Sequence, residues 1–236
     1  MARDLCSWDL AESAIRAGAN RLLLWGPPGV GKSRWALQVL GEGRQHPPVR
    51  VYLNQDLVAQ ELLGHWVPQG HEFRWHHGPV AWAWLYGTGL VIDEIGRASG
   101  PVLDLMLAVL DDQEAARLVL PSGEEIKPSP GFACVATSNN PPDDLDAALT
   151  DRFDVILHVN EPHPVLISRL NSALKGLGDV IRDSYADPER AISPRRALVF
   201  ARFVKAEMKP KVAANLAFGD RAEDILTALK LAGIEL

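Results

Sequence analysis

The 236-residue sequence predicts an α/β protein in which a parallel sheet is sandwiched by helices and followed by a small helical lid. Three observations support this fold class. Apolar, strand-like runs alternate with segments of helical periodicity as far as residue 160, a glycine-rich turn joins the first run to the first helical segment, and only helical periodicity follows Pro162 and Pro164. We therefore expect an α/β domain over residues 1–160 and a helical domain over residues 161–236.

Five apolar runs are predicted to form the strands of the sheet. Each is short and largely apolar, as is typical of strands in a buried parallel sheet. They cover residues 21–25, 49–53, 90–92, 132–137 and 155–159. Helices are expected over residues 33–40, 55–63, 80–86 and 101–110, the last opened by Ser99 and Pro101. Residues 117–126 predict a hairpin that turns at Ser122 and Gly123.

The turn after the first strand predicts a phosphate-binding loop. Residues 26–33 read G-x-x-x-x-G-K-S, and the glycines let successive backbone N–H groups point inward at an anion. Lys32 is expected to reach the β- and γ-phosphates of a nucleotide, and the Ser33 hydroxyl to ligate Mg²⁺. The alternative is a turn that binds nothing, which the flanking strand and helix disfavour. The predicted loop residues are Gly26, Pro27, Pro28, Gly29, Val30, Gly31, Lys32 and Ser33.

A second motif suggests what the bound phosphate is for. The apolar run Leu90–Ile92 ends in two adjacent acids, Asp93 and Glu94. Asp93 at the tip of a strand can hold Mg²⁺ through water, and Glu94 beside it can orient and deprotonate an attacking water. This pairing indicates hydrolysis rather than transfer to a bound acceptor. Two ordinary turn carboxylates are the minor alternative.

With both motifs present, the chain resembles the AAA+ ATPases, and within them the MoxR-like branch that includes CbbQ/NirQ and GvpN-type proteins. The resemblance covers roughly residues 20–205, in order. Beyond the two motifs, it is carried by His77-Gly78-Pro79-Val80, Asp93-Glu94-Ile95-Gly96-Arg97-Ala98, Pro130-Gly131-Phe132, Ala136-Thr137-Ser138-Asn139-Asn140-Pro141, Leu149-Thr150-Asp151-Arg152-Phe153-Asp154 and Ser193-Pro194-Arg195.

The resemblance implies roles for four further residues. Asn139 looks like the polar sensor that helps to hold the lytic water, with Asn140 as the alternative. Arg152 looks like an arginine finger that reaches the γ-phosphate of a neighbouring subunit. Arg195 looks like the lid arginine that contacts phosphate in the same chain, with Arg196 as the alternative. Asn54 is similar in place to a residue that restrains the catalytic glutamate, although an Asn at a strand end is often only a turn former.

An aromatic insertion occupies residues 63–87. It predicts a hairpin followed by a short helix, and in the resembled branch it looks like a helix-2 insert that touches a substrate or partner. Trp66 and Trp75 are expected to be exposed, and Trp82 and Trp84 to pack in the core. The insertion also holds four histidines, but no cysteine accompanies them and their spacing is irregular, so a zinc site is disfavoured.

The resemblance implies an ATPase that uses ATP and Mg²⁺. It also implies a ring of identical subunits, expected to be a hexamer, that remodels a protein partner; in the resembled family this partner is often a von Willebrand factor A-type protein. A nucleic-acid motor or restriction-type GTPase with the same core is the alternative. A scaffold that only binds nucleotide would need a damaged Glu94, Asn139 or Arg152, and all three are present. The choice between ATP and GTP stays open.

Charge and composition bear on partners and location. Residues 1–160 hold 12 Lys and Arg against 20 Asp and Glu, a net charge of −8, whereas residues 161–236 have a net charge of +2. An acidic body does not favour a polyanion, so nucleic acid is not an expected partner. No apolar run is long enough to span a membrane, and the first residues do not resemble a secretion signal. With Cys6 and Cys134 expected as free thiols, a cytoplasmic protein is predicted.

Overall fold

The computed structural model describes residues 6–98, 100–112 and 114–235. Ser99, expected to help open a helix, lies outside this part of the chain. Two compact units are present. The first contains Lys32–His158 and the chain before Pro27, and the second contains Pro27–Gly31 and the chain from Val159 onward.

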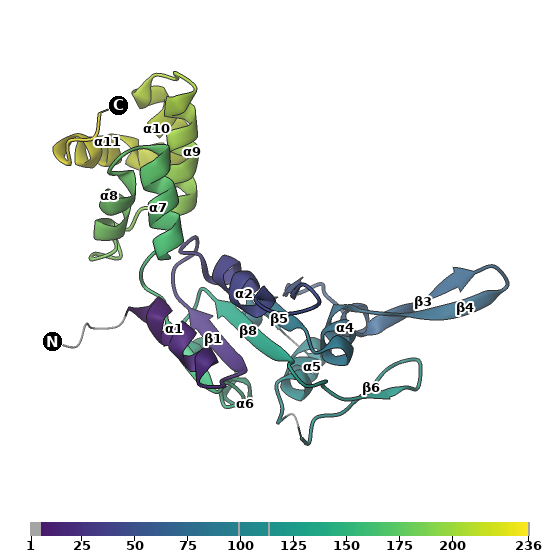
Figure 1. The fold of residues 1–236 in the computed structure, drawn as a ribbon. Coiled ribbons are helices and arrows are strands. Elements are labelled where there is room, and N and C mark those ends of the chain that lie inside the picture. The colour runs from purple at the N-terminus through teal and green to yellow at the C-terminus, as the bar shows by residue number, and fades with distance from the viewer. Residues whose placement is uncertain (1–5, 99, 113, 236) are drawn as a thin grey trace. The chain divides into compact units, whose positions relative to one another are not determined.

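The first unit is built on a parallel sheet of five strands in the order β2-β5-β8-β1-β9 (Figure 1). All four neighbouring pairs are parallel. The central strands β5 and β8 are buried at every residue, in keeping with their unbroken apolar character. The predicted parallel sheet is therefore confirmed. Its strands are β1 (Arg21–Trp25), β2 (Val49–Tyr52), β5 (Gly89–Asp93), β8 (Ala133–Ser138) and β9 (Val155–His158).

Helices cover this sheet, with α1, α2 and α4 in contact with its strands. The helix expected over residues 55–63 is shorter than predicted, because the Asn54 side chain accepts a hydrogen bond from the Asp56 amide at 2.9 Å and stabilises a turn instead. The helices of this unit are α1 (Ser7–Arg16), α2 (Lys32–Gly41), α3 (Ala59–Leu63), α4 (Pro79–Tyr86), α5 (Pro101–Val109) and α6 (Ala147–Thr150), with 3-10 turns at Ile95–Arg97 and Pro142–Asp144.

The aromatic insertion forms the predicted hairpin, β3 (Gly64–Gln69) with β4 (Glu72–His77), followed by α4 (Figure 1). Trp66 is half exposed, as expected. Trp75 was also expected to be exposed, but it is partly buried against the core of this unit and meets the Trp66 ring edge-on at 5.5 Å. Trp84 is fully buried, as expected. The prediction for Trp82 was wrong: it is 39% exposed, because it lies on the outer side of α4 and packs on Tyr86 with a ring separation of 4.1 Å. A second hairpin, β6 (Leu118–Val119) with β7 (Glu125–Ile126), forms where it was predicted.

The second unit is helical around a core of its own, which includes Leu170, Phe200 and Phe218. Its helices are α7 (Pro164–Ala173), α8 (Leu177–Ser184), α9 (Pro194–Lys205), α10 (Pro210–Phe218) and α11 (Ala222–Leu231), with a 3-10 turn at Gly219–Arg221. Three of them begin with proline, whose fixed φ suits the first helical position. Within the described residues, no helix combines the length and apolar character needed to cross a bilayer.

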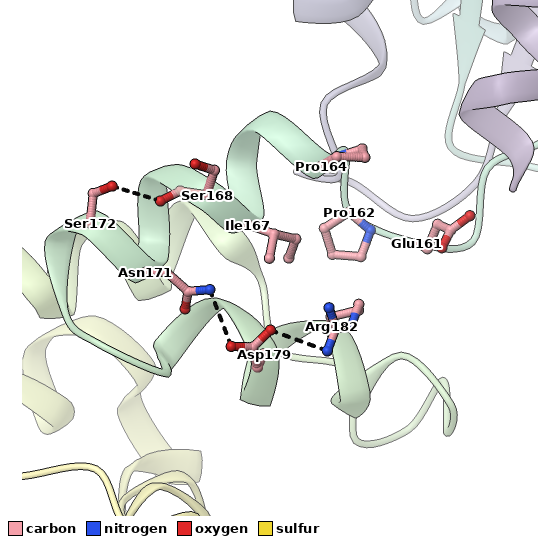
Figure 2. A pocket seen from close by; sticks show the side chains of 9 residues that line it. All are labelled: Glu161, Pro162, Pro164, Ile167, Ser168, Asn171, Ser172, Asp179 and Arg182. Carbon is pink, nitrogen blue, oxygen red and sulfur yellow. Dashed lines mark hydrogen bonds and ion pairs between the residues drawn. The ribbon is translucent and has the colours of Figure 1, made fainter.

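A pocket of about 610 Å³ lies in this helical unit, lined by α7, α8 and the segment before α7 (Figure 2). Its polar side is a small network: the Asn171 amide donates to Asp179 at 3.2 Å, and Asp179 pairs with Arg182 at 3.1 Å. The lining contains none of the residues that the sequence predicts for nucleotide binding or catalysis.

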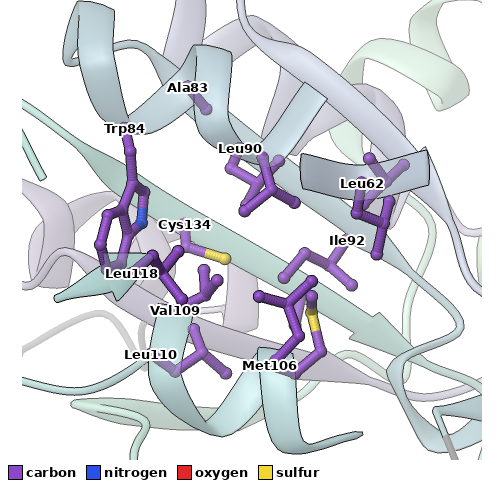
Figure 3. Close-up of a cluster of buried hydrophobic side chains, with 14 of the residues drawn as sticks. Leu62, Ala83, Trp84, Leu90, Ile92, Met106, Val109, Leu110, Leu118 and Cys134 are labelled. Carbon is purple, nitrogen blue, oxygen red and sulfur yellow. The ribbon is translucent and has the colours of Figure 1, made fainter. Parts of the chain in front are cut away.

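The core of the first unit lies between the sheet, α4 and α5 (Figure 3). Trp84 packs there against Leu118 and Cys134 and meets the Phe132 ring edge-on at 6.1 Å. Cys6 and Cys134 are not joined in a disulfide, and Cys6 is only half-buried. Complete burial raises the pKa of the Cys134 thiol, so this side chain stays neutral and serves as a small apolar group.

The two tryptophans of α4 provide a matched test of this core. Trp84→Ala should lower the free energy of unfolding by about 3–5 kcal/mol, because it leaves a large cavity in a fully buried site. Trp82→Ala, on the exposed side of the same helix, should cost under about 1 kcal/mol. Urea denaturation followed by circular dichroism measures both. Equal losses for the two variants would contradict the packing described here.

Candidate functional site

Polar side chains gather at the carboxyl edge of the sheet in the first unit. Asp93 ends β5, and Lys32 and Ser33 begin α2, which follows β1 through the glycine-rich loop. The Ser33 hydroxyl lies 2.5 Å from Asp93 Oδ1, and the Thr137 hydroxyl donates to the same oxygen at 2.8 Å. The fold thus brings the serine of the first motif and the aspartate of the second into direct contact.

Lys32 is buried beside this pair, with only 7% of its surface exposed. Its ammonium group donates to the Gly26 carbonyl at 2.7 Å and to Asn139 Oδ1 at 3.1 Å. Burial lowers the pKa of Lys32 to about 8, and the nearby Glu94 and Asp93 carboxylates only partly offset this effect. The ammonium group is therefore held in a site where additional negative charge would stabilise its protonated form.

Glu94 adopts an unusual backbone conformation. Its φ is +59°, in the left-handed region that residues other than glycine seldom occupy, and such conformations cluster at functional sites. Asn139 donates a short hydrogen bond to Glu94 Oε1, and Arg97 Nε lies 3.8 Å from Oε2. The Asn139 side chain consequently connects Lys32 to Glu94.

The structure distinguishes the two asparagines at the end of β8. Asn139 reaches the Lys32–Glu94 pair through its side chain, whereas Asn140 is joined to the Ser138 hydroxyl through its backbone amide and carbonyl groups. Asn54 takes part in the turn after β2. Among the described residues, Asn139 rather than Asn54 contacts Glu94.

The predicted finger, Arg152, is not part of this cluster. It follows α6 and forms a close ion pair with Asp111, just beyond α5. Each of these side chains is 37% exposed. Arg152 is thus a partly exposed cation that is held by a carboxylate of its own chain.

The middle of the glycine-rich loop belongs to the second unit. Gly29 has a φ of +88°, and a Cβ there would lie 3.2 Å from the Ser193 hydroxyl; Gly31 has a φ of +115°. The His163 amide donates to the Val30 carbonyl at 2.9 Å. This part of the loop therefore packs against the starts of α7 and α9. Arg195 and Arg196, both exposed, lie in the first turn of α9, and both remain candidates for the lid arginine.

The donor set at Ser33 and Asp93 fits Mg²⁺. A hydroxyl and a buried carboxylate are hard oxygen ligands, and Mg²⁺ in nucleotide sites is commonly bound by one or two protein oxygens plus phosphates and water. In the part of the chain that the structure describes, no cluster of three or more His, Cys, Asp and Glu side chains is arranged to hold a metal ion. The histidines of the insertion are included in that statement.

Two contacts of Asp93 were not predicted from the sequence. Arg50, on β2, places Nε and Nη2 each 2.5 Å from Asp93 Oδ2. Only the pairing of β2 with β5 brings these residues together, and the order of strands cannot be read from the local sequence. Thr137 was part of a recognised motif, but its contact with Asp93 was likewise not predicted.

A glycine-rich loop between the first strand and its helix, with a lysine and a serine beside an acid at the end of another parallel strand, defines a P-loop NTPase. The family model for the AAA domain (dynein-related subfamily) matches residues 21–153. The chain belongs to this family and is a MoxR-like AAA+ ATPase, in agreement with the resemblance seen in its sequence. Membership implies nucleotide binding and hydrolysis.

Two relatives illustrate this relationship. Protein NorQ of Paracoccus denitrificans is 36% identical over 129 residues, which make up 52% of this chain and 46% of NorQ. Protein CbbQ of Hydrogenophilus thermoluteolus is 29% identical over 136 residues, 56% of this chain and 49% of CbbQ. The chain spans about half the length of the curated relatives it matches.

Solved structures show the same fold. Hsp104 in a closed-state cryo-EM reconstruction superposes with a TM-score of 0.58 at 17% identity, over 89% of this chain and 44% of that chain. A mutant form of Thermotoga maritima RuvB gives a TM-score of 0.55 at 20% identity, over 97% of this chain and 69% of that chain. At these identities the likeness concerns the fold alone.

The lowered pKa of Lys32 predicts a pH dependence of nucleotide binding. The side chain loses its proton as the pH rises through about 8, and a bound polyphosphate favours the protonated form. Affinity should therefore fall by roughly tenfold between pH 7.5 and 9, with proton uptake on binding at pH 9. Titration calorimetry in buffers of different ionisation enthalpy counts these protons. Lys32→Arg, whose guanidinium group stays charged, should lose the proton uptake, and its absence in the unaltered protein would contradict the prediction.

Proposed function

We propose that this chain hydrolyses ATP in a Mg²⁺-dependent reaction, as a subunit of an oligomeric ring that remodels or activates a protein partner. The observation that carries the proposal is the chain of contacts from Lys32 through Asn139 to Glu94, next to the Ser33–Asp93 pair. These contacts support the proposal, because the residues to which it assigns phosphate binding, metal binding and general-base catalysis lie close together at one edge of the sheet.

Each group has a distinct role in this proposal. The loop Gly26–Ser33 cradles the phosphates with its backbone N–H groups, and Lys32 binds the β- and γ-phosphates. Ser33 and Asp93 hold Mg²⁺, which when bound supplies positive charge to the phosphate oxygens. Glu94 orients a water and takes its proton, while Asn139 keeps the glutamate side chain aimed at that water. Asn54, by its contacts, is better suited to forming the turn after β2.

The proposed ring would give roles to arginines that lie outside the cluster. Arg152 is partly exposed and is held by Asp111, as suits a finger that acts on the nucleotide of a neighbouring subunit. Arg195, or Arg196, would contact phosphate from the lid, and the small space between Gly29 and the Ser193 hydroxyl supports this, because it shows that the start of α9 lies beside the loop. We propose a hexamer, with a nucleotide-binding domain over residues 1–160 and a lid over 161–236.

A protein partner is proposed rather than a nucleic acid. The hairpin β3–β4 presents Trp66 and Phe73, which are 50% and 68% exposed, and aromatic side chains of this kind are enriched in protein interfaces. A von Willebrand factor A-type partner follows from the family resemblance. We propose a cytoplasmic location, which the low cysteine content and the lack of a disulfide between Cys6 and Cys134 support.

Two variants should separate binding from hydrolysis. Lys32→Ala should abolish ATP binding, because it removes the buried cation of the phosphate site. Glu94→Gln should bind ATP with near-normal affinity and lose turnover, because an amide cannot accept the proton of the attacking water. Calorimetry and a phosphate-release assay measure the two properties. Retained affinity in the Lys32 variant, or substantial hydrolysis by the Glu94 variant, would count against the assigned roles.

The finger assignment predicts complementation between subunits. Arg152→Ala should leave ATP affinity nearly intact and slow hydrolysis by roughly 10³–10⁵-fold, since a finger stabilises charge in the transition state. Mixing the Arg152→Ala and Lys32→Ala proteins should recover some activity, at interfaces where an intact finger meets an intact loop. Size-exclusion chromatography with light scattering must show assembly in the same sample. An Arg152→Ala protein that stays fully active in a confirmed ring would remove the assignment.

A further inference from the structure

We propose that Arg50, through its ion pair with Asp93, weakens and thereby sets the affinity of the nucleotide site for Mg²⁺. The inference rests on the proposed function, because it concerns the cation held by Ser33 and Asp93. It assigns a role to a residue on the edge strand of the sheet that lies in neither of the nucleotide-binding motifs.

The two oxygens of the Asp93 carboxylate have separate partners. Oδ1 receives the hydroxyl groups of Ser33 at 2.5 Å and Thr137 at 2.8 Å. Oδ2 receives Nε and Nη2 of Arg50, each at 2.5 Å. The pairing of β2 with β5 sets this arrangement, since Tyr52 lies opposite Asp93 and Arg50 is two residues earlier, on the same side of the strand.

Burial makes this ion pair different from an ordinary surface pair. The Asp93 side chain is 4% exposed, whereas that of Arg50 is 52% exposed. A buried carboxylate is costly without a nearby cation, and the Arg50 guanidinium supplies that charge from the solvent side. The contact therefore gives the buried Asp93 carboxylate a positively charged partner before any metal arrives.

The same guanidinium opposes a second cation. A Mg²⁺ ion at Ser33 and Asp93 would lie within several ångströms of Arg50, where like charges repel appreciably at the dielectric of a partly buried site. Thr137 holds Oδ1 independently of Arg50, so removal of the guanidinium charge leaves the carboxylate in place. The expected result of neutralising Arg50 is consequently tighter, not weaker, binding of Mg²⁺.

The test measures binding rather than turnover. A fluorescent ADP is titrated with Mg²⁺, starting from excess EDTA, and the Mg²⁺ concentration at half-maximal binding is compared among variants. Arg50→Gln keeps hydrogen-bonding capacity but not the charge, and should lower this concentration by about tenfold. Arg50→Lys keeps the charge and should stay within about twofold of the unaltered protein. Arg16→Ala, which removes an exposed cation paired with Glu12, is the matched control and should change nothing.

Thermal unfolding provides a second readout. In EDTA, Arg50→Gln should melt at a lower temperature, because the buried Asp93 loses its compensating charge, and saturating Mg²⁺ with ADP should restore most of the difference. Arg50→Met is a second neutral variant for the case that Arg50→Gln folds poorly. An unchanged or higher Mg²⁺ requirement in folded neutral variants would overturn this inference alone. If the unaltered protein bound no ADP at any Mg²⁺ concentration, the proposed function would fail with it.

Discussion

The buried carboxylate of Asp93 is the group on which the rest of the site depends. It ends a strand that is buried throughout, and it joins the first turn of α2 through Ser33, the neighbouring strand β8 through Thr137 and the edge strand β2 through Arg50. One charge thus connects three strands and a helix. Because an ionised carboxylate is stable in such a place only with several donors, the sheet order and the position of the phosphate loop are linked to its chemistry.

Lys32 and Glu94 carry opposite charges and are connected through the Asn139 side chain. Lys32 is buried, whereas Glu94 directly follows β5 and has a left-handed backbone conformation. Asn139, which follows β8, contacts both side chains and links them through hydrogen bonds. The parallel sheet makes this possible, since the carboxyl ends of all its strands meet at one edge.

Arg152, the β3–β4 hairpin and Trp82 lie at the surface and are not part of the cluster around Asp93. Arg152 is paired with Asp111 at a partly exposed position, and the β3–β4 hairpin carries exposed aromatic rings. Trp82 was expected in the core and instead packs on Tyr86 at the surface of α4. Tryptophans two positions apart on a helix that packs on one side cannot both be buried, because their side chains point in directions about 160° apart.

The sequence by itself determined the strands of the sheet, the phosphate loop and the acids after β5, because local apolar runs, glycines and adjacent polar residues report backbone geometry directly. It also placed Trp84 in the core. The tertiary structure alone decided that Arg50 pairs with Asp93, that Asn139 rather than Asn54 contacts Glu94, and that Arg152 meets Asp111. These contacts join residues about 40 positions apart, and they depend on strand order and register, which no local pattern of residues specifies.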